Sequence, residues 1–198
     1  MGVAETLEDA AAAARACTVC ADLPLGPRPI LRVSTTAQLL IIGQAPGTKV
    51  HATGIPWNDP SGDRLRDWLR MSRDEFYDEA RVAIVPAGLC YPGRLPHGGD
   101  APPRPVCAPL WHPRLLPLLV GIRLTLLVGS YAQAAALGPG GMTERVRRFR
   151  AHLPRYFPLP HPSWRTIGWA ARNPWFAGEV LPALREQVAA ALVPGSNM

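Results

Sequence analysis

Four short apolar runs, each followed by glycine or proline, are the clearest pattern along this chain of 198 residues. The runs lie at residues 38–42, 81–85, 123–128 and 156–159. Apolar runs without alternating polar positions are typical of strands that are covered on both faces. Helical patterns separate or follow the runs, at residues 62–71, 115–119, 131–137, 143–152 and 179–192. This alternation predicts an α/β fold in which helices cover both faces of a parallel sheet.

The composition is that of one globular domain. With 198 residues, 47% of them hydrophobic, the chain can bury a core of its own. It has no internal repeat and no long linker, and its 23 prolines and 18 glycines are spread between the apolar runs. Spread in this way, they favour many ordered loops over disorder. We therefore expect residues 1–198 to form a single domain, with a short surface helix around residues 10–14.

No segment of the sequence has the pattern of a membrane span or a signal peptide. The longest apolar stretch, residues 115–128, is interrupted by Pro117, Gly121 and Arg123. The N-terminus lacks the basic start and the apolar stretch of a secretory signal. We expect a soluble, cytoplasmic monomer without a membrane partner. In a reducing compartment, its four cysteines are expected to be metal ligands or thiols and not disulfides.

The charge balance favours an anionic partner. Twenty-one Lys and Arg residues against fifteen Asp and Glu residues give a formal net charge of +6. An excess of positive charge attracts polyanions such as nucleic acids. A net charge of +6 is modest, so the charge alone does not identify the partner, and the candidate site residues must be considered.

The four cysteines are spaced like the ligands of one metal centre. Two residues separate Cys17 from Cys20, a further 69 precede Cys90, and 16 lie between Cys90 and Cys107. Four thiolates suit either zinc or a 4Fe–4S cluster. A second cysteine pair with two intervening residues, which a structural zinc ribbon usually has, is absent. The spacing predicts a metal that links the N-terminus to the middle of the chain, with unliganded core cysteines as the alternative.

A glycine-rich loop follows the first predicted strand directly. Its sequence is Gly43-Gln44-Ala45-Pro46-Gly47-Thr48. The backbone N–H groups of such a turn can point toward an anion or toward a ring that carries carbonyl groups. The loop has neither Gly-Lys-Ser/Thr nor the Gly-x-Gly-x-x-Gly spacing, so it is not a nucleotide-phosphate loop. A simple tight turn is the alternative.

A second candidate segment, residues 54–63, combines an aromatic ring, an amide and a carboxylate. Trp57, Asn58 and Asp59 follow one another in this segment. Together they can stack on a flat ligand and form hydrogen bonds to its edge. Asp63 or Ser61 is the expected N-cap of the helix that follows.

A histidine between two prolines follows the fourth predicted strand. Both neighbours of His161 are prolines, which restrict the backbone around it. Such a histidine is a candidate general acid or a donor that stabilises an anion, and a loop histidine with a structural hydrogen bond is the alternative. Ser163 and Arg165 are suitable phosphate ligands. Farther along the chain, Trp175 and Phe176 are expected in the core.

Taken in their order, these motifs resemble the uracil-DNA glycosylase superfamily. The order is Gly-Gln-Ala-Pro-Gly, Gly-Ile-Pro-Trp, four spaced cysteines and His-Pro-Ser, and it extends from about Cys17 to Phe176. The resemblance is closest to the iron–sulfur branch, known as family four. It implies a three-layer α/β/α sandwich around a four-stranded parallel sheet. It also implies a structural 4Fe–4S cluster, whose ligands would be Cys17, Cys20, Cys90 and Cys107.

The resemblance further implies roles for single residues. Those expected to bind substrate are Gly43, Ala45, Pro46, Gly47, Trp57 and Asn58. Trp57 takes the place of an aromatic residue, usually Phe, that stacks on the flipped base. His161 matches the histidine that donates a hydrogen bond to uracil O2, and Gln44 belongs to the motif that helps to place the attacking water. Ser163 matches the serine that binds DNA phosphate, with Arg165 close to it in the sequence.

Two motifs depart from the family pattern. Ala45 stands where the best-known branch has a water-activating Asp, and Gln44 stands where family four usually has Glu. Pro86 stands where an Asn usually reads the edge of uracil. Asp59 lies in a segment similar to one that carries an acidic catalytic residue in family five. We therefore expect Asp59 to supply the missing carboxylate.

These roles predict a DNA repair glycosylase that rotates uracil out of DNA and hydrolyses the N-glycosidic bond, leaving an abasic site. Its partner would be uracil-containing DNA, and its cofactor a 4Fe–4S cluster, with structural zinc as the alternative. Two other functions stay open. One is a DNA lesion-binding protein of the same fold with little turnover, which Ala45 and Pro86 suggest. The other is a zinc-containing enzyme that acts on a small nucleobase or nucleotide.

Overall fold

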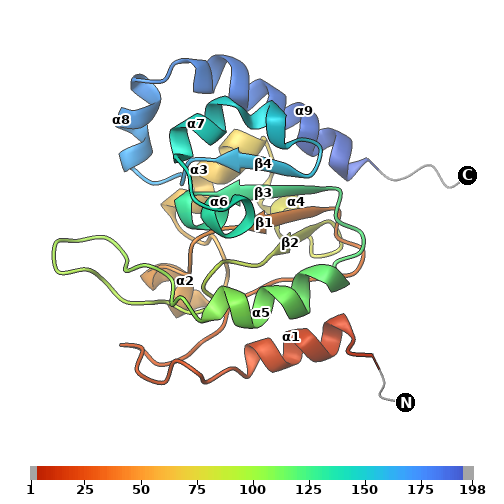
Figure 1. Cartoon of the computed structure of the whole chain (residues 1–198), viewed down its shortest axis with the longest axis vertical. Coiled ribbons are helices and arrows are strands. Elements are labelled where there is room, and N and C mark those ends of the chain that lie inside the picture. The colour runs from red at the N-terminus through yellow and green to blue at the C-terminus, as the bar shows by residue number, and fades with distance from the viewer. Residues whose placement is uncertain (1–3, 194–198) are drawn as a thin grey trace, which may run out of the picture.

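A four-stranded parallel sheet forms the centre of the computed structural model, which describes residues 4–193 (Figure 1). The strands are β1 (Leu39–Ile42), β2 (Val82–Ile84), β3 (Leu124–Val128) and β4 (Tyr156–Leu159). Their order across the sheet is β2-β1-β3-β4, and every neighbouring pair is parallel. Each strand lies within one of the four apolar runs, so the expected α/β fold with a parallel sheet is confirmed.

Helices cover both faces of the sheet because side chains alternate along each strand. On one face, Leu39 and Ile41 pack in a core with α3 (Pro60–Leu69), α7 (Met142–Arg147) and α9 (Leu181–Leu192). On the other face, the core contains residues from three further helices, α1 (Leu7–Arg15), α5 (Cys107–Leu115) and α6 (Ser130–Leu137). The result is the three-layer sandwich that the family resemblance implies, with α1 and α5 on the side opposite α3 and α9 (Figure 1).

Helix α1 contains the predicted surface helix at residues 10–14 and is longer than predicted at both ends. A reciprocal pair of hydrogen bonds between Thr6 and Asp9 caps its N-terminus. Its buried alanines, Ala10, Ala11 and Ala14, belong to the same core as α5. The small side chains let α1 approach that core closely, so the helix is a packed part of the domain and not only a surface element.

The structure differs from the sequence prediction in several helices. The predicted helix at 115–119 is a short 3₁₀ turn, η1 (Leu116–Leu118), and the longer α5 precedes it. Pro113 lies inside α5. Because proline is unfavourable in a helix interior, the sequence pattern did not predict this helix. The predicted helix at 143–152 divides into α7 and the 3₁₀ segment η2 (Phe149–His152).

Three short helices have no counterpart in the sequence prediction. They are α2 (Thr48–Thr53), α4 (Arg73–Tyr77) and α8 (Arg165–Ala171). Helices of this length are stabilised mainly by tertiary contacts, so periodicity alone does not reveal them. The segment before α9 forms a π-helical turn, η3 (Phe176–Val180).

The remaining expectations concern the core and the membrane. Phe176 is buried, as predicted, and the partly buried Trp175 packs against the same core. Within residues 4–193, no helix combines the length and the apolar character that crossing a bilayer requires.

Candidate functional site

The loops that follow β1 and β4 meet at one edge of the sheet, because the two strands run in the same direction. With the segment before α3, these loops surround a cavity of about 360 Å³. The predicted site residues that line it are Gly43, Gln44, Ala45, Pro46, Gly47, Trp57, Asp59, His161, Ser163 and Arg165. The fold therefore brings three distant sequence motifs to one cavity.

Asn58 is the predicted substrate-binding residue that the structure does not bring to the cavity lining. Its Oδ1 accepts a hydrogen bond from Arg73 Nη2 at 2.9 Å. Asn58 thus contacts α4, while its neighbours Trp57 and Asp59 both line the cavity. The expected helix cap is also wrong, because Asp59 caps α3, its Oδ1 accepting from the Gly62 N–H at 2.8 Å.

The glycine at the end of β1 makes room for the Trp57 indole. A Cβ atom at Gly43 would lie 2.7 Å from Cζ2 of Trp57, closer than a real Cβ contact allows. Glycine at this position therefore lets the ring lie directly against the backbone of the first loop. The indole and this backbone both line the cavity.

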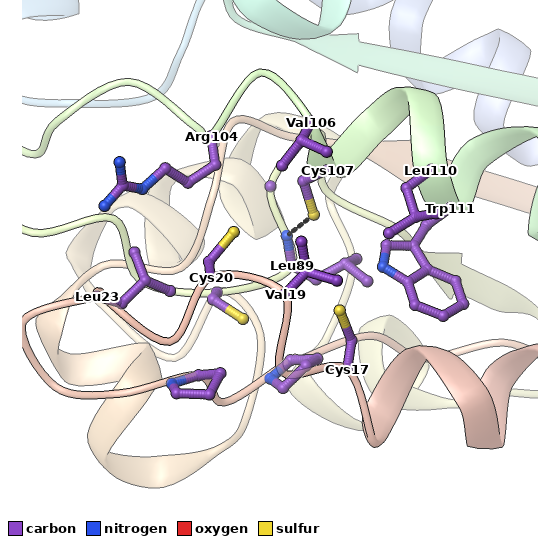
Figure 2. Close-up of a pocket in the computed structure, with 14 residues that line it drawn as sticks. Cys17, Val19, Cys20, Leu23, Leu89, Arg104, Val106, Cys107, Leu110 and Trp111 are labelled. Atoms are coloured by element: carbon purple, nitrogen blue, oxygen red, sulfur yellow. Dashed lines mark hydrogen bonds between the residues drawn. The ribbon is translucent and has the colours of Figure 1, made fainter.

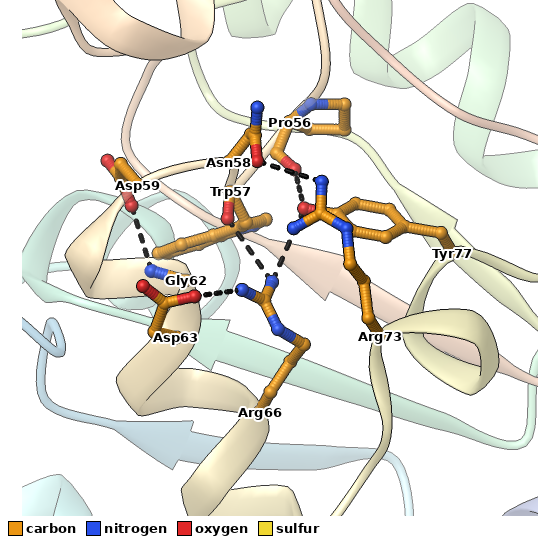
Figure 3. Close-up of polar contacts among 9 residues, drawn as sticks. All are labelled: Pro56, Trp57, Asn58, Asp59, Gly62, Asp63, Arg66, Arg73 and Tyr77. Atoms are coloured by element: carbon orange, nitrogen blue, oxygen red, sulfur yellow. Dashed lines mark hydrogen bonds and ion pairs between the residues drawn. The ribbon is translucent and has the colours of Figure 1, made fainter.

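A polar network behind Trp57 holds it in an unusual backbone conformation. Trp57 has φ 57°, a left-handed value that non-glycine residues rarely adopt. The buried guanidinium of Arg66 donates to the Trp57 carbonyl at 3.3 Å, and Tyr77 donates its hydroxyl to the carbonyl of Pro56 at 2.8 Å. Arg66 also forms an ion pair with Asp63 (Figure 3). These contacts support the left-handed turn from outside the cavity.

The His161 ring lies beside the Trp57 ring, and both residues line the cavity. The two ring centroids are 5.7 Å apart, and the ring planes make an angle of 32°. The hydroxyl of Thr166 donates to the His161 carbonyl, and Gly129, at φ 91°, leaves the space that the His161 side chain occupies. Burial lowers the pKa of His161, and the nearby negative charge of Asp59 only partly opposes this effect. The imidazole is therefore neutral at pH 7 and can donate one hydrogen bond.

Pro86, two residues after the end of β2, lines the cavity at the position where the family resemblance led us to expect an asparagine. Proline has no side-chain amide, so it offers no donor or acceptor of that kind to a base. Its carbonyl lies 3.1 Å from Nε2 of His112. Burial lowers the pKa of His112, which leaves a neutral imidazole to donate to this carbonyl.

Asp100 is a cavity residue that the sequence analysis missed. It lies in the loop between Cys90 and Cys107, which Figure 1 shows extending from the body of the domain. Partial burial raises the pKa of Asp100; Arg94 opposes this, and the negative charge of Asp59 adds to it. The sequence offered no sign of this placement, because Asp100 follows no predicted strand and belongs to no motif.

The rim of the cavity carries exposed aromatic and basic side chains. Trp164 is 72% exposed, and Ile167, three residues farther along the chain, is 61% exposed. The guanidinium carbon of Arg165 lies 5.2 Å from the Trp164 ring centroid. Aromatic rings beside positive charge are typical of surfaces that bind single-stranded nucleic acids. Ser163 lines the cavity immediately before this rim.

The four cysteines line a second pocket, which shares no lining residue with the cavity. Cys17 and Cys20 come from the loop after α1, Cys90 comes from the loop after β2, and Cys107 is the first residue of α5. Figure 2 shows the sulfur atoms of Cys17, Cys20 and Cys107 around one space. The backbone N–H of Leu89 donates to Sγ of Cys107 at 3.2 Å.

The thiol environment suits a soft metal, and the donor set is that of zinc or of an iron–sulfur cluster. Burial raises the pKa of Cys90 to about 11; a backbone hydrogen bond opposes this, and the neighbouring cysteines add to it. Burial also raises the pKa of Cys107. Among residues 4–193, however, no three Cys, His, Asp or Glu side chains are as close together as a bound metal ion requires. The chemistry of the residues fits a metal, and their present positions do not form a complete ligand sphere.

A comparison with models of protein families gives a match to the Uracil DNA glycosylase superfamily over residues 32–185. The match covers all four strands and every residue that the sequence analysis placed in the cavity. It also covers Cys90 and Cys107, and it begins after Cys17 and Cys20. The match to the superfamily therefore extends over most of the chain.

Proposed function

Because the chain belongs to the Uracil DNA glycosylase superfamily, we propose that it removes uracil from DNA by hydrolysing the N-glycosidic bond. The observation that carries this proposal is the meeting of Trp57, His161 and the first glycine-rich loop around one cavity of about 360 Å³. A base within a duplex cannot reach such a cavity, so it must first rotate out of the stack. Unpaired or single-stranded uracil costs less to rotate out and is the expected better substrate.

Binding begins with the phosphates. The net charge of +6 attracts DNA, and Arg165 and Ser163 at the cavity rim are the proposed phosphate ligands. The exposed ring of Trp164 offers a surface on which a neighbouring base can stack. These contacts would supply part of the free energy that base rotation requires.

Within the cavity, Trp57 would stack on the uracil ring, and His161 would stabilise the leaving group. The bond between the sugar and the base breaks with its electron pair on the base, so negative charge develops on uracil. A neutral His161 N–H can donate to the uracil oxygen that acquires this charge, and one such donor contributes roughly 3 kcal/mol in other enzymes. The Asp59 carboxylate would stabilise the positive charge that develops on the sugar.

Gln44 lines the cavity, and its Nε2 donates to the carbonyl of Ala101 at 3.3 Å. We propose that this bond orients the amide, so that Gln44 helps to place the base and the attacking water. Pro86 supplies no amide to read the base edge, so the choice of base depends on the first loop and on His161.

For the cysteines we propose a 4Fe–4S cluster held by Cys17, Cys20, Cys90 and Cys107, with a structural role. Bound there, the cluster would connect the segment after α1 to α5 and hold the ends of the loop between Cys90 and Cys107 in place. Zinc is the alternative for the same donor set. Protein purified without air should be brown and contain iron and acid-labile sulfide; a colourless protein that contains zinc would overturn the cluster.

The test of the proposed function is a panel of oligonucleotides that carry uracil, a deaminated purine or an oxidised pyrimidine, each single-stranded and double-stranded. We expect free uracil and an alkali-labile site from the uracil substrates. Tight binding without an alkali-labile site would instead show a lesion-binding protein. Turnover of free nucleotides, but not of DNA, would show an enzyme that acts on small nucleobase compounds.

A further inference from the structure

Asp100 and Asp59 approach the same part of the cavity from different segments of the chain. A Cβ atom at Gly47 would lie 3.2 Å from Oδ2 of Asp100 and 3.9 Å from Oδ2 of Asp59. Both carboxylates therefore border Gly47, in the loop that is proposed to hold the base. The negative charge of Asp59 also contributes to the raised pKa of Asp100, after the larger effect of burial.

The two carboxylates differ in what they are bound to. One oxygen of Asp59 accepts the Gly62 N–H at 2.8 Å, so this residue is held as the cap of α3. In the part of the chain that the structure describes, no side-chain hydrogen bond to the Asp100 carboxylate is found. Asp100 therefore has both oxygens available for a water molecule at the cavity.

The backbone fixes the position of Asp100. Its loop is a hairpin in which Leu95 donates to the carbonyl of Gly99 at 2.9 Å and Ala101 donates to the carbonyl of Gly93 at 2.8 Å. Gly99 has φ 86°, which the turn requires. The Gln44 amide bonds to the Ala101 carbonyl, directly after Asp100. This hydrogen bond connects the first loop to the hairpin that carries Asp100.

We propose that Asp100 is the general base that takes a proton from the attacking water. This inference rests on the proposed function, the hydrolysis of the N-glycosidic bond. The water oxygen bonds to C1′ of the sugar while the bond from C1′ to the base breaks, its electron pair leaving with the base. The water proton passes to the Asp100 carboxylate, and the base, stabilised by His161, later takes a proton from solvent. The products are the free base and an abasic sugar with a hydroxyl on C1′.

This role accounts for the absence of a carboxylate in the first motif. Gln44 and Ala45 cannot take up the proton of the water, whereas a carboxylate at the same cavity can. A carboxyl group whose pKa lies above its usual value is a stronger base than an ordinary surface carboxylate. In this arrangement Gln44 is a positioning residue, because its amide holds the hairpin that carries Asp100.

The test compares Asp100→Ala with the control Asp67→Asn, which changes an exposed carboxylate on α3. Single-turnover excision is measured on a single-stranded uracil oligonucleotide, and affinity on an oligonucleotide with a non-cleavable 2′-fluoro uridine. We expect Asp100→Ala to slow excision at least about 100-fold with nearly unchanged affinity and melting temperature. Added formate, which can occupy the space of the lost carboxylate, should restore part of the rate.

The outcomes separate this inference from the proposed function. A wild-type protein that excises no base from any substrate would overturn the proposed function. A wild-type protein that excises uracil, with Asp100→Ala within about threefold of its rate, would overturn only the role of Asp100. If Asp100→Ala is unstable, the same comparison is made with Asp100→Asn. A slow variant that formate does not restore would assign Asp100 a structural role, and the proposal would fail.

Discussion

The carbonyl oxygen of Trp57 lies against Gly62 so closely that a Cβ atom at Gly62 would be 1.7 Å from it. Gly62 belongs to the first turn of α3, and its N–H is bound by the cap Asp59. The helix start and the left-handed turn at Trp57 therefore occupy one space. A side chain at residue 62 would force at least one of them to change its conformation.

This contact predicts a large loss of stability in Gly62→Ala. The new methyl group must displace either the Trp57 backbone or the first turn of α3, at a cost of at least about 3 kcal/mol. Urea unfolding measures the change. Gly178→Ala is the control, because nothing lies within 4 Å of its added Cβ, and this variant should differ from wild type by no more than about 1 kcal/mol. Equal stabilities of the two variants would contradict the proposed conflict at Trp57.

Replacement of His161 should affect the chemical step more than DNA binding. His161→Ala removes the imidazole N–H donor beside Trp57, and we expect excision of uracil to slow by about 100- to 1000-fold. Single-turnover rates measure this change, and affinity for a non-cleavable uracil analogue should stay within about threefold. Equal losses of rate and affinity would show that the residue acts mainly in binding.

The lowered pKa of His161 predicts a particular dependence of stability on pH. Since burial lowers the folded-state pKa below the usual 6.5, the unfolded chain takes up the proton first as the pH falls. The stabilising contribution is complete above pH 6.5 and is lost as the pH falls from there through the folded-state pKa. Urea unfolding at about pH 7 and about pH 5 should show a smaller difference for His161→Asn than for wild type. A larger difference in the variant would contradict the direction of the shift.

Trp164 should contribute to DNA affinity and little to folding, because its ring is 72% exposed. Loss of one stacking surface in Trp164→Ala should weaken binding of single-stranded DNA by about 5- to 100-fold. Fluorescence anisotropy measures the affinity, and the melting temperature should not change. Val120→Ala, at a position 79% exposed and outside the cavity lining, is the control with unchanged affinity. Similar affinities of both variants would place the DNA elsewhere.

The cysteine pocket predicts a coupled loss of metal and stability in Cys107→Ser. We expect lower metal content and a melting temperature lower by about 5–10 °C or more, because the proposed metal would no longer connect α5 to the segment after α1. Metal analysis and calorimetry measure both quantities. Thr18→Ala, an exposed position between two of the proposed ligands, should retain the metal. Unchanged metal content in Cys107→Ser would exclude this residue as a ligand.

The cavity shows how far the sequence could predict a site. The first loop and His161 were predictable because each follows an apolar strand, and the carboxyl ends of parallel strands meet at one edge. The direction of Asn58 was not predictable, because it depends on Arg73, which lies in a short helix that periodicity did not reveal. The cap of α3 was assigned to the wrong residue, since Ser61, Asp63 and Asp59 all have suitable side chains.

The sequence by itself determined the layers, the strand order along the chain and the motifs of the superfamily, because these depend on local apolar patterns and on short spacings. Only the tertiary structure decided that Asp100 joins Asp59 at Gly47 and that Asn58 leaves the cavity lining. The physical reason is that both outcomes depend on contacts between segments far apart in the chain. Loop paths and side-chain directions follow from those contacts, and local sequence does not encode them.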